Sequence, residues 1–172
     1  MAWTPSDGTP EATGASRSRS AHRRLRPRRP PVIVYVDTSA LLKLLVDEPG
    51  TDVMLEVAAD SPTAASSALT EVEARAALAR MRAGGRLTAG QHRATARRFD
   101  DLWEEVGALA VDRAVLRHAV ALAETHALRA YSAVHLASAL TVAQAGPVAF
   151  ACFDDELRSA AAAEGLTLTP PA

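Results

Sequence analysis

The chain has 172 residues and a formal net charge of −1, with 48% apolar and 23% charged residues, enough for one domain with a real core and too few for two full ones. Its single cysteine, Cys152, excludes an internal disulfide framework and a cysteine-rich zinc module, and it fits a reducing, cytoplasmic compartment.

Residues 1–31 form a basic arm rich in Pro, Arg and Ser, with seven arginines against two acidic residues. We expect this arm to be disordered, either as a leader without function (or a start placed too early) or as an arm that touches nucleic acid. It has no apolar stretch of the kind found in secretory signal peptides. The remaining residues, 32–172, carry 12 basic and 18 acidic residues, so nucleic-acid binding would have to come from a local site.

Strand and helix patterns alternate from residue 32 onward. Residues 32–36 are five consecutive β-branched or aromatic residues, which indicates a strand buried on both faces. The other predicted strands are 62–66, 106–111, 148–152 and 166–169. The predicted helices are 39–47, 51–59, 70–83, 88–105 with a cap at Thr88, 112–126 with a cap at Asp112, 130–145 and 154–164.

This alternation predicts a three-layer α/β/α domain over residues 32–172, with a short-stranded, mostly parallel sheet covered by helices on both faces. Residues 130–153 contain no Asp, Glu, Lys or Arg. Because Gly146-Pro147 interrupts this run and polar residues are scattered in it, a buried helix followed by a buried strand explains it better than a membrane span.

Three carboxylates are predicted at one edge of the sheet. Asp37 and Asp154 each follow a strand, and Glu73 lies in the first turn of a helix that follows another strand. The carboxyl ends of parallel strands form the usual ligand site of such sheets. Clustered carboxylates need a counter-charge, and Mg²⁺ or Mn²⁺ suits oxygen ligands and can activate water at a phosphodiester.

Each carboxylate could also have a purely structural role as a helix cap. For any one of these residues taken alone, capping is more common than metal binding. Asp37 and Asp154 could each be only the N-cap of the helix that follows it. Glu73 fits a capping box with Thr70, in which its carboxylate turns back onto the backbone of that threonine. The metal interpretation gains because all three residues fall at the same edge of the sheet.

Four segments in order resemble the PIN-domain family, specifically VapC-type toxin ribonucleases of type II toxin–antitoxin systems. They are residues 34–41 (VYVDTSAL), 67–78 (SALTEVEARAAL), 128–140 (LRAYSAVHLASAL) and 153–157 (FDDEL). The resemblance spans about residues 32–167. It implies a Mg²⁺- or Mn²⁺-dependent endoribonuclease that cleaves RNA by metal-activated water, with Asp37, Glu73 and Asp154 as metal-binding and catalytic residues.

The resemblance also implies partners. Such toxins usually form homodimers and are neutralised by a small VapB-like antitoxin. The chain departs from the family at Ser132, where the family usually has a metal-binding aspartate. A second hypothesis is therefore a catalytically weakened PIN-fold module that binds or regulates, and a third is another metal-dependent phosphoesterase.

Several neighbouring residues are given structural roles. Glu71 lies two positions before Glu73, on another helix face, and is not placed in the site. His135 lies one turn beyond Ser132 on the same helix face, and we expect it to pack between helices with a backbone partner. The remaining expectations are packing roles for Trp103 and Tyr131 and a buried apolar role for Cys152.

Overall fold

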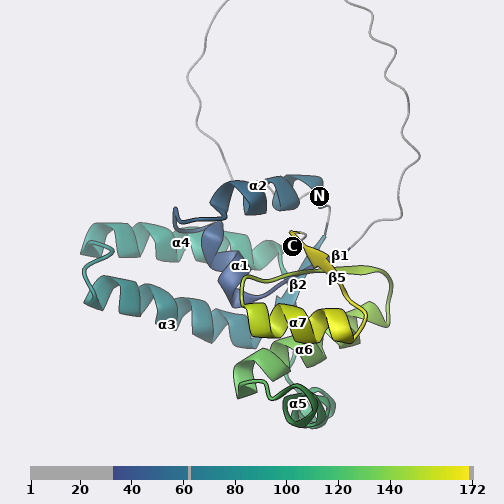
Figure 1. Cartoon of the computed structure of the whole chain (residues 1–172). Helices are drawn as coiled ribbons and strands as arrows, with labels where there is room; N and C mark the ends of the chain where they lie inside the picture. The colour runs from purple at the N-terminus through teal and green to yellow at the C-terminus, as the bar shows by residue number, and fades with distance from the viewer. Residues whose placement is uncertain (1–32, 62, 171–172) are drawn as a thin grey trace, which may run out of the picture.

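The computed structural model describes residues 33–61 and 63–170, and the predicted N-terminal arm lies outside these residues (Figure 1). The strands are β1 (Ile33–Val36), β2 (Ala64–Ser67), β3 (Gly107–Leu109), β4 (Val148–Ala151) and β5 (Thr167–Thr169). The helices are α1 (Thr38–Lys43), α2 (Thr51–Asp60), α3 (Leu69–Ala83), α4 (Ala89–Glu105), α5 (Arg113–His126), α6 (Ala130–Ala143) and α7 (Asp155–Ala163).

The five strands form one sheet in the order β3-β2-β1-β4-β5, and every pair is parallel. β1 is central and pairs with β4 through Val36 and Ala151 at their carboxyl ends. Both strands therefore end at the same edge of the sheet. The loops that follow them place Asp37 and Asp154 at this edge.

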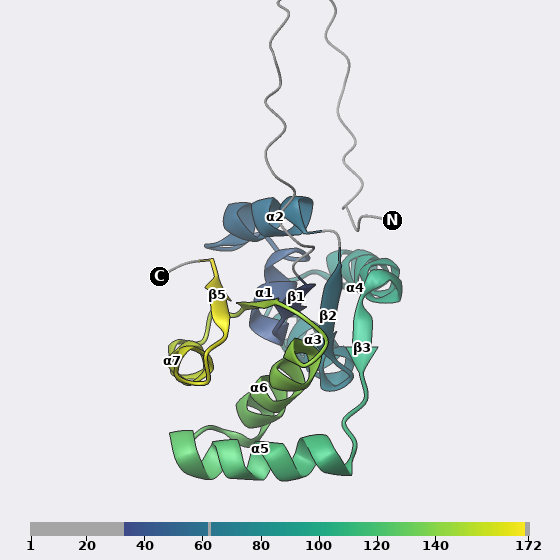
Figure 2. The ribbon, with the colours of Figure 1, turned by 90° about the vertical axis from the view of Figure 1, so that its right-hand side faces the viewer.

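Side chains alternate between two apolar cores, one on each face of the sheet. Tyr35 and Phe150 point to the face that α5, α6 and α7 cover. Val34 and Val36 point to the opposite face, which α1, α2, α3 and α4 cover. Figure 2 shows α5 and α6 on one side of the strands and α2 and α4 on the other. The predicted three-layer α/β/α architecture with a parallel sheet is confirmed.

Most predicted elements form, and the two largest differences in length concern the predicted helix 39–47 and the predicted strand 106–111, each of which is three residues shorter. Regular helix ends at Lys43, and the backbone turns over the next three residues. Here a side chain replaces the helical hydrogen bonds, because the Thr51 hydroxyl donates to the carbonyls of Lys43 and Val46, at 3.0 and 3.3 Å. The predicted strand 106–111 is also shorter, since Val106 ends α4.

The expectation about the apolar run 130–153 holds as well. It folds into α6, a turn and β4. Among the residues that the structure describes, no helix combines the length and apolar character needed to cross a bilayer.

Candidate active site

Asp37 lies where β1 ends and is the N-cap of α1. Its Oδ2 accepts hydrogen bonds from the Ser39 backbone N–H at 3.0 Å and from the Ser39 hydroxyl at 2.6 Å. The capping interpretation is therefore correct for this oxygen. The other oxygen, Oδ1, faces His135, whose Nε2 lies 3.5 Å away. Capping thus occupies one side of the carboxylate and leaves the other directed at the neighbouring polar groups.

Glu73 does not form the predicted capping box. Its Oε2 accepts hydrogen bonds from the Thr38 hydroxyl at 2.5 Å and from His135 Nε2 at 2.8 Å. Thr70 is fully buried behind β2, and its hydroxyl bonds to that of Ser66 at 2.7 Å. Because α3 already begins at Leu69, Glu73 is free to turn toward β1 rather than back toward its own helix end.

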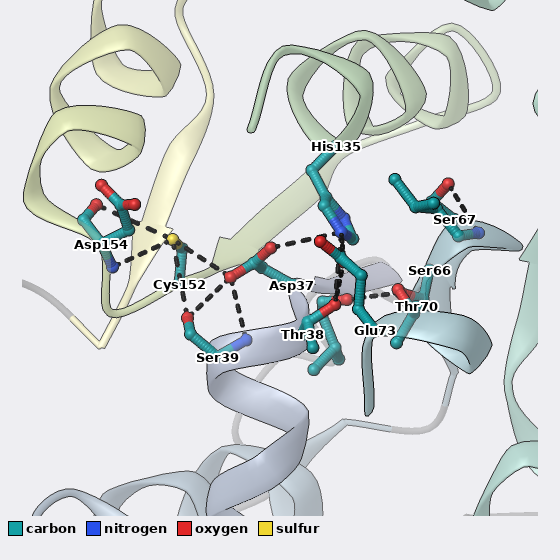
Figure 3. Close-up of polar contacts among 12 residues, drawn as sticks. Asp37, Thr38, Ser39, Ser66, Ser67, Thr70, Glu73, His135, Cys152 and Asp154 are labelled. Atoms are coloured by element: carbon teal, nitrogen blue, oxygen red, sulfur yellow. Dashed lines mark hydrogen bonds and ion pairs between the residues drawn. The ribbon is translucent and has the colours of Figure 1, made fainter. Parts of the chain in front are cut away.

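His135 joins the two carboxylates, and the expected backbone partner is wrong. The side chain is 1% exposed. Its Nδ1 lies 3.1 Å from the Tyr35 hydroxyl, and its Nε2 faces both Glu73 and Asp37 (Figure 3). The place of His135 in the site could have been predicted from the sequence, because His135 shares a helix face with Ser132, and this face points at the sheet edge.

Charge in this network shifts two pKa values in opposite directions. Burial would lower the pKa of His135, but its hydrogen bond to Glu73 and the charges of Asp37 and Glu73 raise it above the ordinary value. Burial would raise the pKa of Glu73, but hydrogen bonds from His135 and Thr38 hold it below the ordinary value. Each group therefore favours the charged form of the other: the carboxylate stabilises an imidazolium, and the imidazole hydrogen bond stabilises the ionised carboxylate.

Asp154 lies at the same edge, one side chain removed from Asp37. It is the N-cap of α7, and its Oδ1 accepts from the Leu157 N–H at 3.1 Å, as the capping interpretation predicted. Cys152 lies between the two aspartates: its Sγ is 3.3 Å from the Asp154 nitrogen and 3.6 Å from Asp37 Oδ2 (Figure 3). The thiol therefore links Asp37 to the backbone of Asp154, while the Asp154 carboxylate itself caps α7.

Cys152 is fully buried, as predicted, and its thiol should not react with alkylating reagents in the folded protein. Burial, and secondly the charge of Asp37, raise the pKa of its thiol to about 12. We expect no labelling by iodoacetamide at pH 8 in native buffer and complete labelling in guanidinium chloride, read by intact mass. Rapid labelling of the folded protein would contradict this burial.

An open cleft of about 430 Å³ collects these groups. Its lining includes all four predicted site positions, Asp37, Glu73, Ser132 and Asp154, together with His135. Glu71 is exposed and does not line the cleft.

Tyr131 also lines the cleft, and its expected packing role is wrong, because its side chain is 63% exposed. Trp103 does pack, stacking on Phe99 with ring centroids 5.7 Å apart. Sequence reasoning also missed Thr38 and Arg80 as cleft residues; the only signal for Thr38 was its place directly after Asp37.

The donor chemistry of the cleft fits a hard divalent cation. Asp37 and Glu73 present carboxylate oxygens to the same point, where His135 Nε2 lies, and Mg²⁺ and Mn²⁺ prefer such ligands. Asp154 and Ser132 line the same cleft. Over residues 33–61 and 63–170, no group of three or more His, Cys, Asp or Glu side chains is arranged to hold a metal ion. Asp37 and Glu73 are the two predicted ligands whose carboxylates meet at one point, and Asp154 as a further ligand stays a prediction.

Known proteins resemble the chain in sequence over most of its length. Residues 34–163 match the family model described as PIN domain. The chain is 38% identical over 138 residues to ribonuclease VapC45 of Mycobacterium tuberculosis, covering 80% of this chain and 95% of the relative.

Solved structures share the fold at lower identity. VapC20 of Mycobacterium tuberculosis, a sarcin-ricin loop cleaving toxin, superposes with a TM-score of 0.58 at 18% identity, over 78% of this chain and 96% of VapC20. VapBC-5 from the same organism, of the VapBC family of toxin–antitoxin systems, gives a TM-score of 0.54 at 18% identity, over 80% of this chain and 98% of that one.

Proposed function

Because the chain belongs to the PIN-domain family as a VapC-type member, we propose that it is a metal-dependent endoribonuclease, the toxin of a toxin–antitoxin pair. The observation that carries this proposal is the meeting of the Asp37 and Glu73 carboxylates at one imidazole nitrogen in an open cleft. Relatives named as ribonucleases at 38% identity supply the substrate class. The test is cleavage of total RNA during a titration with Mg²⁺ and Mn²⁺, with EDTA as the control.

Two kinds of role are proposed for the residues of the cleft: holding the cation and fixing the carboxylates that hold it. Asp37 and Glu73 would hold the cation, and Asp154, which lines the same cleft, would contribute a further carboxylate. A bound Mg²⁺ or Mn²⁺ supplies an acidic water and stabilises charge on phosphoryl oxygens. Thr38 and His135 are positioning residues, because their hydrogen bonds fix the Glu73 carboxylate. The Ser39 contacts fix Asp37 in the same way.

The distribution of charge supports a polyanionic substrate. Residues 74–99, the hairpin of α3 and α4, contain no acidic residue and seven arginines, whereas the rest of 32–172 has five basic and 18 acidic residues. The seven are Arg75, Arg80, Arg82, Arg86, Arg93, Arg97 and Arg98. The local positive charge that RNA binding requires is therefore present, despite the acidic total.

Removing two exposed arginines of this hairpin should weaken RNA binding. Arg93 and Arg97 lie one turn apart on α4, and Arg113 and Arg117 form an exposed pair with the same spacing on α5. We expect R93Q/R97Q to lower affinity for single-stranded RNA and to reduce the salt slope of log K by about 1.4, at about 0.7 per phosphate contact. The measurement is fluorescence anisotropy in EDTA.

The matched control is R113Q/R117Q, which changes the net charge equally and should leave the slope unchanged. Equal losses in the two double variants would mean that only bulk charge matters and would remove this support for RNA.

A second candidate function is a catalytically weakened module that binds RNA or protein without cleaving. The observation that favours it is the hydroxyl of Ser132 in the cleft, at the position that corresponds to the usual family aspartate. It predicts RNA binding without turnover at any Mg²⁺ or Mn²⁺ concentration. The cation titration therefore separates the two candidates.

The proposal extends to partners and compartment. VapBC structures share this fold, which supports a small VapB-like antitoxin as the inhibitor and a homodimer as the active form. An RNA substrate and a lone thiol support a cytoplasmic location. Co-purification with the product of a neighbouring small gene, together with the mass of the assembly by light scattering, tests both partners.

A further inference from the structure

The rim of the cleft carries the two most exposed large apolar side chains of the described residues. Val72 on α3 is 67% exposed and Tyr131 on α6 is 63% exposed, and both line the cleft. The other exposed large apolar side chains lie on α2 and α5 and do not line it; they are Val53, Leu55, Leu116 and Val120. Exposed apolar surface gathered at one functional cleft marks a ligand contact more often than chance.

The surroundings of this rim are charged in a way that a nucleotide would satisfy. The carboxylates of Asp37 and Glu73 lie on the cleft floor, where they would hold a cation whose positive charge would attract a phosphate. Arg80 lines the cleft two turns along α3 from Glu73, and its guanidinium is a group that pairs well with phosphate. A phosphate at the floor and an apolar base at the rim are two parts of one ligand.

From this arrangement we propose that Tyr131, with Val72 at the same rim, is the stacking platform for an unpaired base next to the scissile phosphate. The inference rests on the proposed ribonuclease function and assigns to Tyr131 a role in substrate selection: its ring holds a nucleotide that is not base-paired. A base within a duplex has both faces stacked on its neighbours and cannot lie on a tyrosine ring. Tyr131 is a positioning and specificity residue, and no proton transfer is assigned to it.

The test uses an RNA hairpin with 2-aminopurine in its loop and a duplex with the same base paired. Binding is measured in EDTA at low salt, so that no cleavage is needed. We expect the parent protein to quench the loop probe and prefer it to the duplex. Tyr131→Ala should lose the quenching and bind the loop about 5- to 150-fold more weakly, the range for one stacked base. Tyr131→Phe should behave like the parent.

Leu116→Ala is the matched control, since it removes an exposed apolar side chain outside the cleft. It should match the parent with both probes. Tyr131→Leu keeps an apolar side chain without a π face, and it should lose quenching while melting at the parental temperature. In cleavage assays, Tyr131→Ala should raise KM for loop RNA and leave kcat within about threefold.

The proposal is overturned if Tyr131→Ala binds and quenches like the parent, if Leu116→Ala has the same effect, or if the parent binds neither probe. It is also overturned if Tyr131→Ala loses only affinity for a protein inhibitor, because the rim would then be a protein-docking surface. Stacking without cleavage under any cation would instead reject the ribonuclease and leave the stacking platform in place.

Discussion

Asp37→Asn is expected to abolish RNA cleavage and leave the fold intact. The amide keeps one oxygen to accept the Ser39 N–H, and asparagine is as good an N-cap as aspartate. The negative charge toward the cleft is lost, and with it one of the two carboxylates that fit a divalent cation. Loss of several kcal/mol of charge stabilisation corresponds to a rate decrease of about 1,000-fold or more.

Asp37→Ala separates the two roles of this residue. It removes the charge and the cap together, so activity should fall as far as in Asp37→Asn. The lost cap should additionally cost about 1 kcal/mol, or a few degrees in Tm. The measurements are RNA cleavage at saturating Mn²⁺ and thermal unfolding followed by circular dichroism. Parental activity in Asp37→Asn would show that Asp37 is only a helix cap.

Ser132→Asp is expected to strengthen divalent-cation binding and to raise cleavage. Ser132 lies in the first turn of α6 and lines the cleft, so an aspartate there adds a fourth carboxylate to the lining. The number of charged ligands controls cation affinity. A tenfold lower Kd for Mn²⁺ adds about 1.4 kcal/mol to the stability of the loaded protein. The gain is read as a larger rise in Tm on Mn²⁺ addition than in the parent.

The metal-free variant should respond in the opposite sense. A further negative charge near Asp37 and Glu73 lowers its stability. The position at a helix N-terminus, where a negative charge is favourable, offsets about 0.3 to 1 kcal/mol of this loss. Ser132→Asn is the control, because it changes the shape in the same way without adding charge, and it should leave the Mn²⁺ response unchanged. If the parent is already fully active at low Mg²⁺ and the aspartate adds nothing, Ser132 is a harmless replacement and the weakened-module hypothesis fails.

Local patterns in the sequence were enough for the fold. Five consecutive β-branched or aromatic residues identify the central strand, and the spacing of apolar residues between turn residues identifies the helices. These signals are local, since burial on both faces and helical periodicity are properties of short segments. Parallel order then follows from the alternation of strands and helices, and it brings Asp37, Glu73 and Asp154 to one edge.

Contacts between distant segments decided what the side chains at that edge do. Glu73 fits a capping box by its spacing, yet it bonds to Thr38 and His135, 35 and 62 residues away in the chain. Spacing along one helix cannot reveal such partners, because the order and pairing of the strands determine which distant segments meet. Exposure is equally a tertiary property: Tyr131 and Trp103 are both aromatic residues in helical segments, but α4 turns Trp103 onto Phe99, and the start of α6 leaves Tyr131 open to the cleft.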